Sequence, residues 1–243
     1  MSSIELSVVI PAYNESARLP STLRRICAYL DGVGTTYEVV VVDDGSTDGT
    51  ADLARATLEM RHSVLVNDRN RGKGYSVRRG MLAARGSRCL MTDADLSTPI
   101  EDLPLLLARL DEGFDVAIGS RAVESSNIEV HQAWYRENLG RLFNLLVRLL
   151  AVEGIADTQC GFKLFTADAS RVCFEATRLD GFSFDVEALH IARRSGRRIA
   201  EVGVTWRNDV GTRVTMWRGL AAFGDLFRIR SNSILGRYGS VSV

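Results

Sequence analysis

Short apolar runs alternate with segments of helical periodicity through the first 110 residues, and this alternation restricts the fold more than any other feature of the sequence. The runs end at Ile10, Val42, Val66 and Met91, and each is followed by a loop rich in Gly, Asp, Asn or Pro. Strands joined by helices form right-handed crossovers, which produce a parallel sheet with helices on both faces. We therefore predict an α/β fold with a mostly parallel central sheet.

The same patterns set the expected element boundaries along the whole chain. Strands are expected at 6–10, 38–42, 64–66, 88–91, 115–119 and 199–206. Helices are expected at 16–30, 50–59, 72–84, 101–111, 134–152, 182–193 and 216–235. The last of these mixes Trp, Phe and Leu with arginines, so it is expected either to pack on the sheet or to touch a membrane surface or lipid. No repeat, low-complexity tract or linker divides the sequence, which predicts one domain over 1–243.

Loops that follow parallel strands meet at one edge of the sheet, and this edge is where α/β folds bind ligands. An aromatic face and carboxylates there would suit the base and ribose of a nucleotide. A lysine between two glycines would suit its phosphates. The residues concerned are Pro11, Tyr13, Glu15, Asp43, Asp44 and Lys73. The sequence has neither a G-x-G-x-x-G nor a Walker lysine pattern, which argues against NAD(P) and P-loop chemistry.

Two carboxylates, Asp93 and Asp95, follow the fourth apolar run at spacing i, i+2. If the chain turns there, both can converge on Mg²⁺ or Mn²⁺, which would keep open positions for substrate phosphates. If the chain stays extended, they point to opposite sides. A solvated loop or a helix N-cap is the alternative interpretation of the same residues.

Composition restricts the class of protein. Thirty basic and thirty acidic side chains give a net charge of zero, so a broad nucleic-acid surface is not expected. The four cysteines lack metal-type spacing, which predicts reduced, packed thiols in a cytosolic protein. The N-terminus lacks a signal-peptide pattern, and no apolar run reaches the roughly 18 residues that a spanning helix needs. Lys73 and Lys163 are the only lysines.

Motifs distributed over most of the chain resemble family 2 glycosyltransferases with the GT-A fold. Three match in order and spacing: VVIPAYNE at 8–15, VVDDGSTDGT at 41–50 and DAD at 93–95. Further motifs are similar to those of the branch that glycosylates polyprenyl phosphates, closer to dolichyl-phosphate β-glucosyltransferases than to dolichyl-phosphate mannose synthases. These lie at 70–74, 119–121, 157–165, 181–187 and 225–230.

The resemblance implies an inverting, metal-dependent transfer of a hexose, glucose from UDP-glucose, to a polyprenyl or dolichyl phosphate. It divides the domain into a nucleotide-sugar-binding half at 6–120, an acceptor-binding half at 121–215 and an amphipathic segment at 216–243. Asp93 and Asp95 would hold Mg²⁺ or Mn²⁺. The implied donor-binding residues are Pro11, Tyr13, Glu15, Asp43, Asp44, Lys73, Asp93 and Ala94.

A phosphate acceptor is mostly ionised near pH 7, because its second pKa is about 6, so it needs positive charge rather than a strong base. The resemblance implies Arg121 and Arg136 as acceptor-phosphate ligands, and more loosely Arg213. Together with Asp157, the first two are the expected catalytic residues. Asp157, Gln159 and Lys163 would line the sugar and acceptor pocket. If Asp157 acts as a base, the acceptor would instead be a hydroxyl.

Three alternatives stay open: a GDP-mannose-dependent polyprenyl-phosphate mannosyltransferase, a soluble transferase with a hydroxyl acceptor, and an inactive nucleotide-sugar-binding subunit. Ser97 stands where mannose synthases often carry a metal-binding Gln. The expected partners are a nucleotide sugar, a polyprenyl phosphate, and a membrane surface or membrane protein, without nucleic acid. The expected location is cytoplasmic, peripheral at the cytoplasmic face of a membrane.

Overall fold

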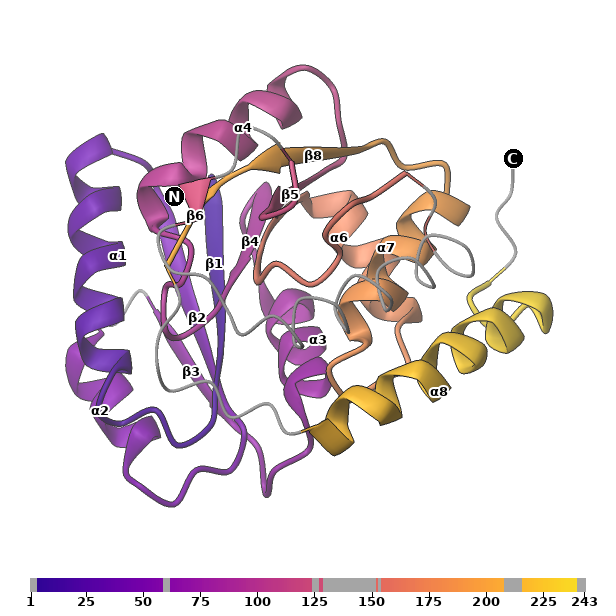
Figure 1. Ribbon diagram of the computed structural model, residues 1–243. Helices are drawn as coiled ribbons and strands as arrows, with labels where there is room; N and C mark the ends of the chain where they lie inside the picture. Colours follow the sequence, from indigo (N-terminus) through magenta and orange to yellow (C-terminus); the bar gives the residue numbers. More distant parts are fainter. Residues whose placement is uncertain are drawn as a thin grey trace.

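A seven-stranded sheet forms the centre of the computed structural model, which describes residues 4–58, 62–123, 127–128, 152, 154–207 and 216–239 (Figure 1). The strand order is β3-β2-β1-β4-β7-β5-β8. The bounds are β1 Leu6–Ala12, β2 Tyr37–Asp43, β3 Ser63–Val66, β4 Arg88–Thr92, β5 Val116–Ser120, β7 Phe162–Thr166 and β8 Ile199–Gly203. All neighbouring strands are parallel except β7, which runs antiparallel to both β4 and β5. The predicted α/β fold with a mostly parallel sheet is confirmed.

Helices cover both faces of this sheet (Figure 1). One core cluster joins the sheet to α1, α2 and α4, and the other joins it to α3, α6, α7 and α8. The bounds are α1 Leu19–Val33, α2 Thr50–Thr57, α3 Lys73–Ala83, α4 Leu103–Asp111, α6 Ala167–Ala176, α7 Phe184–Arg194 and α8 Met216–Ile234. A 3₁₀ turn, η1 (Ile100–Asp102), precedes α4.

The four valines of β2 explain why this strand lies inside the sheet. Val40 and Val42 belong to one core cluster, and Val39 and Val41 belong to the other. Each valine is at most 1% exposed. Successive side chains of a strand point to opposite faces, so an unbroken apolar run can be buried only where both faces are covered.

The later strands differ from the predicted ones. The apolar stretch 162–166 is a strand, β7, which the periodicity does not predict. The single strand expected at 199–206 is two strands, because the chain leaves the main sheet after Gly203. Its continuation, β9 (Thr205–Trp206), pairs in parallel with β6 (Asn127–Ile128) in a small second sheet. The helix expected at 134–152 lies outside the described residues except for Val152.

The helix expected at 216–235 is present as α8, but it packs along α7 and not directly on the sheet, which differs from the expected packing. Leu226 and Ile229 are buried in the same core cluster as the apolar residues of α7. The Oγ of Ser233 lies 2.9 Å from Nε2 of His190 and accepts a hydrogen bond from Arg194. In the described ranges, none of the helices combines the length and the apolar character needed to cross a bilayer.

Close packing of α3 on the sheet requires a glycine. A Cβ at Gly80 would lie 2.4 Å from Val9 Cγ1 and 2.9 Å from Val42 Cγ2, whereas a Cβ at Gly32 of α1 would meet nothing within 4 Å. We therefore expect Gly80→Ala to lower the free energy of unfolding by about 1–3 kcal/mol through overpacking. Gly32→Ala should leave it unchanged or raise it by up to about 1 kcal/mol.

Urea denaturation of the two variants measures this difference. Equal effects of the two substitutions would contradict the tight α3–sheet contact.

Candidate active site

Side-chain hydrogen bonds tie the loop after β1 to the loop after β2 at one end of the sheet. The Asn14 N–H donates to Ser46 Oγ (2.9 Å), and the Glu15 N–H donates to Thr50 Oγ1 (2.9 Å). In return, the Thr47 N–H donates to Asn14 Oδ1 (3.0 Å). Asn14 has a φ of 54°, in the left-handed region that Asn tolerates better than most residues. Two of the loops predicted to share an edge are therefore held together by the protein itself.

Three predicted donor-binding residues lie at the end of β1 or in the loop that follows it, in different environments. Tyr13 leaves 43% of its surface exposed, so its ring is available for stacking. The Glu15 carboxylate pairs with Arg18 at 2.8 Å, and Pro11 is half-buried near the end of β1.

Asp43 and Asp44 are both buried but use their carboxylates differently. Asp44 accepts hydrogen bonds from the backbone N–H groups of Arg71 (2.9 Å) and Gly72 (2.8 Å), so it fixes the loop that opens α3. Asp43 accepts from the Ser46 N–H through Oδ2 (3.1 Å), and its Oδ1 has no hydrogen-bond partner among the described residues. A buried acceptor without a partner costs about 1–3 kcal/mol. Asp43 is thus the better of the two candidates for accepting a hydrogen bond from a ligand.

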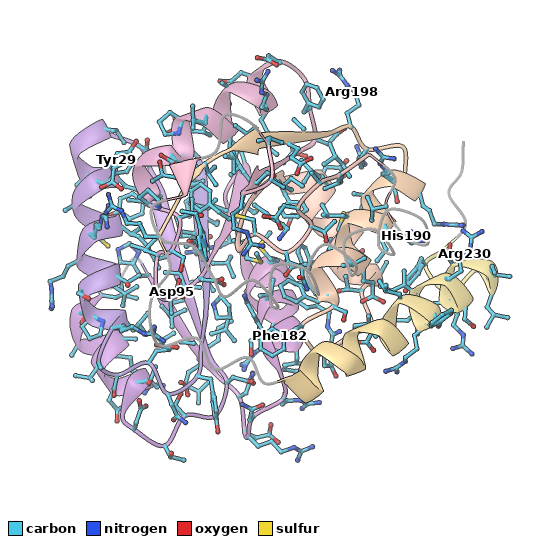
Figure 2. The ribbon with its side chains drawn as sticks, viewed as in Figure 1. Tyr29, Asp95, Phe182, His190, Arg198 and Arg230 are labelled. Atoms are coloured by element: carbon cyan, nitrogen blue, oxygen red, sulfur yellow. The ribbon has the colours of Figure 1, made fainter. Side chains whose placement is uncertain are left out.

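The chain turns directly after β4, as the metal interpretation of the acidic pair requires. The Leu96 N–H donates to the carbonyl of Asp93 (3.2 Å), and Leu96 has a φ of 47°. The Ser97 N–H donates to Asp95 Oδ1 (3.0 Å). The hydroxyl of Thr22 on α1 donates to the carbonyl of Ala94 (2.7 Å), which anchors the turn to α1. Asp93 and Asp95 are both partly exposed at this turn, where Figure 2 labels Asp95.

Lys73 binds one member of the acidic pair. Its Nζ lies 2.7 Å from Asp93 Oδ1, with about a fifth of the side chain exposed. Burial by itself would lower the pKa of Lys73, but the charges of Asp93 and Asp185 outweigh it and raise that pKa, so the lysine is cationic. Asp93 is also covered by Gly161, where a Cβ would lie 2.1 Å from Asp93 Oδ2. The loops after β3 and β4 and the residues before β7 therefore meet at Asp93.

Lys163 is not an exposed pocket residue. It is 1% exposed, and its Nζ donates to Asp185 Oδ1 (2.7 Å) and to the carbonyl of Cys160. Burial raises the pKa of Asp185 most, although Lys163 and Lys73 oppose that rise. The Lys163–Asp185 pair and the Lys73–Asp93 pair together form a row of alternating positive and negative charges. In this row Lys163 lies in the interior and stabilises Asp185, and it does not face the loops at the edge of the sheet.

Arg121 and Asp157 form a two-pronged ion pair. Arg121 Nε and Nη2 donate to the two carboxylate oxygens of Asp157 at 2.6 and 2.8 Å. Backbone N–H groups of Arg121 and Gln159 donate to the same carboxylate at 3.1 Å. Burial alone would raise the pKa of Asp157, but the hydrogen bonds and charge of Arg121 lower it overall. Asp157 is therefore an ionised holder of Arg121, without the basicity that a proton acceptor needs.

Arg121 belongs to the same site as the acidic pair. Its pKa is raised above the usual value: burial opposes the rise, and the hydrogen bonds and charge of Asp157 outweigh burial, with a smaller contribution from the charge of Asp93. The guanidinium lies 5.5 Å from the ring centre of Trp206 on β9. With 31% of its side chain exposed, Arg121 can still bind an anion. Gln159 is exposed beside it.

The residues after β4 fit a divalent cation by donor chemistry. Asp93 and Asp95 supply the hard oxygen ligands that Mg²⁺ and Mn²⁺ prefer, and Asp93 already binds the cationic Lys73. Within the described ranges, no group of three or more His, Cys, Asp or Glu could hold a metal. Mg²⁺ is commonly held by one or two carboxylates together with substrate phosphates and water. Two carboxylates thus suit an ion that binds together with a diphosphate.

Arg136 and Arg213, the other predicted acceptor ligands, lie outside the described residues. Some contributors were not predicted as site residues. Asp185 lies in the first turn of α7, where acidic residues are common, and only its burial between two lysines reveals its role. Glu201 accepts the backbone N–H groups of Ala156 and Asp157 at 2.8 Å, so it positions the acid that holds Arg121. The apolar pattern of the strand that contains Glu201 does not predict this positioning role.

Comparison with solved structures identifies the fold. The chain is similar to glucosyl-3-phosphoglycerate synthase from Mycobacterium tuberculosis in complex with UDP, with a TM-score of 0.71 and 20% identity over 93% of this chain and 80% of that one. The same enzyme in complex with Mn²⁺, UDP-glucose and phosphoglyceric acid gives a TM-score of 0.66 at 22% identity, over 97% and 80% of the two chains. The fold is that of GT-A glycosyltransferases.

The sequence comparisons give the family. The model described as glycosyl transferase family 2 matches residues 7–174. A dolichyl-phosphate beta-glucosyltransferase from Drosophila melanogaster is 40% identical over 259 residues, covering 99% of this chain and 79% of that protein. The Homo sapiens protein of the same name is 37% identical over 250 residues, covering 96% and 77%. The chain belongs to glycosyl transferase family 2.

The Arg121–Asp157 pair makes a pH-dependent contribution to stability. Because the pKa of Asp157 is lower in the folded chain than its unfolded value of about 3.9, the pair stabilises fully above about pH 5 and less as the pH falls through the folded pKa. Asp157→Asn should lower the free energy of unfolding by about 2–3 kcal/mol near pH 7, below the range for fully buried pairs because Arg121 is partly exposed.

Urea denaturation at several pH values from about 7 to about 3 measures this contribution. The difference in the free energy of unfolding between the wild-type chain and Asp157→Asn should become smaller as the pH falls. Asp111→Asn, which removes an exposed pair with Arg88, is the matched control and should cost less than about 1 kcal/mol. A gap for Asp157→Asn that is constant with pH would contradict the assignment.

Proposed function

We propose that this chain transfers a glucosyl group from UDP-glucose to a polyprenyl phosphate such as dolichyl phosphate, with inversion and with Mg²⁺ or Mn²⁺. The observation that carries the proposal is a cation, Arg121, held by Asp157 in the same short segment, 157–161, whose Gly161 covers Asp93 of the acidic pair after β4. One site can then receive a diphosphate on one side and a second phosphate on the other. The names of the curated relatives, dolichyl-phosphate beta-glucosyltransferases, support glucose over mannose.

The donor would lie along the loops that follow β1, β2 and β3. Tyr13 offers an exposed ring to the base, and Oδ1 of Asp43 offers a buried acceptor for a base N–H. Glu15 and Pro11 would border the nucleoside, while Asp44 acts by fixing the backbone before Lys73. Lys73 would face the diphosphate, since a cation bound to Asp93 is already at the place where phosphates would arrive.

Asp93 and Asp95 would hold the metal, with the Ala94 backbone between them anchored to Thr22. The ion, when bound, would neutralise charge on the departing nucleotide. Ser97 gives its N–H to Asp95, so the backbone at 97 supports the Asp95 carboxylate.

The acceptor would bind at Arg121. A phosphate oxygen would attack C1 of the glucosyl group, the bond from C1 to the donor β-phosphate oxygen would break, and UDP would leave with that electron pair. The step needs no proton acceptor, because the phosphate is already ionised near pH 7. This agrees with Asp157, whose two oxygens are occupied by Arg121 and Gln159. A hydroxyl acceptor would need a base, and Asp157 is poorly suited to be one.

The remaining expected residues take more limited parts. Gln159 would border the acceptor, because its side chain is exposed beside Arg121. Lys163 would act through Asp185, which lies near Lys73, rather than on the acceptor itself. Arg136 and Arg213 would add positive charge around the acceptor phosphate. The lipid substrate implies that the chain works at a membrane surface.

A radiolabelled transfer assay tests this function. The chain is incubated with Mn²⁺, a short polyprenyl phosphate and either UDP-glucose or GDP-mannose. We expect label from UDP-glucose in the organic phase, loss of transfer after EDTA, and little transfer from GDP-mannose. Label from GDP-mannose alone would contradict the donor, and hydrolysis of UDP-glucose without a lipid product would contradict the acceptor.

Variants assign the result to the site. Asp95→Asn should lower kcat by at least about a hundredfold, because the developing negative charge loses its metal. Asp52→Asn, at an acid of α2 whose side chain is 86% exposed, is the control and should retain full activity. Normal Mn²⁺-dependent turnover by Asp95→Asn would contradict the metal assignment.

A further inference from the structure

The outward face of α8 carries large apolar side chains in a line. Phe227 is 66% exposed and Ile234 is 73% exposed, and they lie seven residues apart, on the same side of the helix. Leu235, directly after the helix, is 60% exposed. The opposite side of α8 is buried through Leu226 and Ile229. The helix is thus packed on one face and leaves an apolar stripe on the other.

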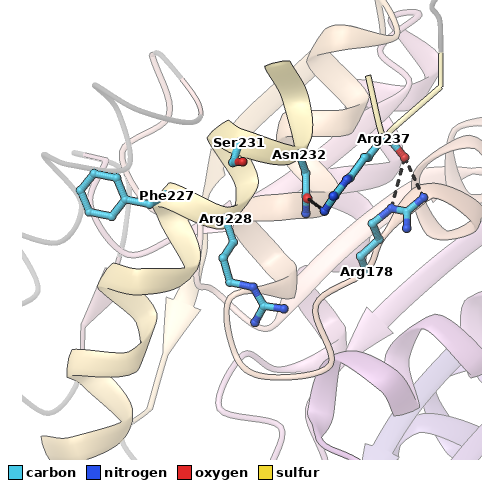
Figure 3. A pocket seen from close by; sticks show the side chains of 6 residues that line it. All are labelled: Arg178, Phe227, Arg228, Ser231, Asn232 and Arg237. Carbon is cyan, nitrogen blue, oxygen red and sulfur yellow. Dashed lines mark hydrogen bonds between the residues drawn. The ribbon is translucent and has the colours of Figure 1, made fainter. Parts of the chain in front are cut away.

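Arginines border this stripe and surround a cavity of about 460 Å³ (Figure 3). Among the residues that the structure describes, no acidic side chain lines the cavity; its lining residues are Arg178, Phe227, Arg228, Ser231, Asn232 and Arg237.

Two of the arginines are held in place by the protein. Arg178 Nε and Nη2 donate to the carbonyl of Arg237 at 3.2 and 2.9 Å. Arg237 Nη1 donates to Oδ1 of the buried Asn232 (3.1 Å). The nearby buried acid, Glu187, already accepts the N–H groups of Arg178 and Leu179 and the hydroxyl of Tyr238.

The third arginine is weakly paired. Arg228 Nη1 lies 3.6 Å from Asp225, and the Arg228 side chain is 70% exposed. Positive charge in this cavity is therefore only partly neutralised by the described residues.

We propose that this cavity binds the phosphate headgroup of an anionic bilayer lipid, while Phe227, Ile234 and Leu235 enter the boundary of the acyl chains. Guanidinium groups are suited to phosphate oxygens, and an exposed apolar stripe flanked by arginines is the pattern of a helix lying in a membrane interface. A soluble anion would account for the arginines alone. It would leave the neighbouring Phe, Ile and Leu without a function.

The orientation of α8 would place a docked bilayer near the edge of the sheet where the acceptor is expected to bind. In Figure 1, α8 runs along the outside of α7, and its first turn points toward the end of the molecule where the loops after β1 and β2 lie. A bilayer that covers α8 would therefore lie toward the edge at which the acceptor is expected. The docking itself does not depend on the transfer reaction.

Vesicle co-sedimentation tests the proposal with the full chain. We expect at least tenfold tighter binding to vesicles of phosphatidylcholine with about 30% phosphatidylglycerol than to phosphatidylcholine alone. Arg228→Gln with Arg237→Gln should weaken binding to the anionic vesicles by roughly tenfold or more, since each arginine near an anionic surface contributes. Phe227→Ser with Ile234→Ser should weaken binding to both kinds of vesicle.

The controls are an exposed arginine and an exposed leucine on α2. Arg55→Gln and Leu53→Ser should leave vesicle binding unchanged. Unaltered binding by either α8 double variant would overturn the proposal. So would tight binding of inorganic phosphate that competes fully with vesicles, which would indicate a free-anion site. A concentration-dependent dimer that Phe227→Ser dissociates, without vesicle binding, would indicate a protein interface.

Transfer to a water-soluble short-chain acceptor without vesicles keeps this proposal separate from the proposed function. The α8 variants should retain that activity. Wild-type chain that transfers glucose there but ignores anionic vesicles would overturn the docking proposal alone. Wild-type chain that binds anionic vesicles but transfers nothing would overturn the function alone.

Discussion

The antiparallel strand β7 is the element on which the site depends. It pairs with β4 on one side and with β5 on the other, so Lys163 lies opposite both Met91 and Ile118. The residues before β7 consequently cross the end of β4, where only glycine at 161 leaves room for the Asp93 carboxylate. Parallel pairing would bring in this segment from the opposite end. A single strand direction thus joins the loop 157–161 to the acidic turn.

Paired charges are the second requirement of this arrangement. Removing an ion from water costs several kcal/mol, and a partner in good geometry is needed to offset that cost. Asp93 has Lys73, Asp185 has Lys163, and Asp157 has Arg121. Buried ion pairs contribute little net stability compared with apolar packing. Their use here fits a site that must hold cations in fixed positions for phosphate groups.

How far the sequence predicts this structure depends on the kind of pattern. The four valines of β2 predict a strand buried on both faces, because such a strand needs apolar residues at consecutive positions. The acidic pair after β4 predicts a polar loop at the end of that strand, because the change from apolar to acidic residues occurs within a few neighbouring positions. The strand β7 is hard to predict from the sequence, because its five residues include the charged Lys163. Its antiparallel direction cannot be predicted either, because no local pattern specifies strand direction. The partners of Asp185 and Glu201 come from distant segments, so their roles follow only from tertiary contacts. Arg121 was predicted from the resemblance, whereas its fixation by Asp157 required the structure.

Anomalous diffraction from crystals of the chain with Mn²⁺ and UDP would locate the metal and the nucleotide relative to the turn after β4. We expect a manganese peak at the carboxylates of Asp93 and Asp95, next to the UDP diphosphate, with the base beside Tyr13 and Asp43 and with Arg121 facing the diphosphate across the site. A manganese peak at other residues would contradict this expectation, as would UDP bound away from the turn after β4.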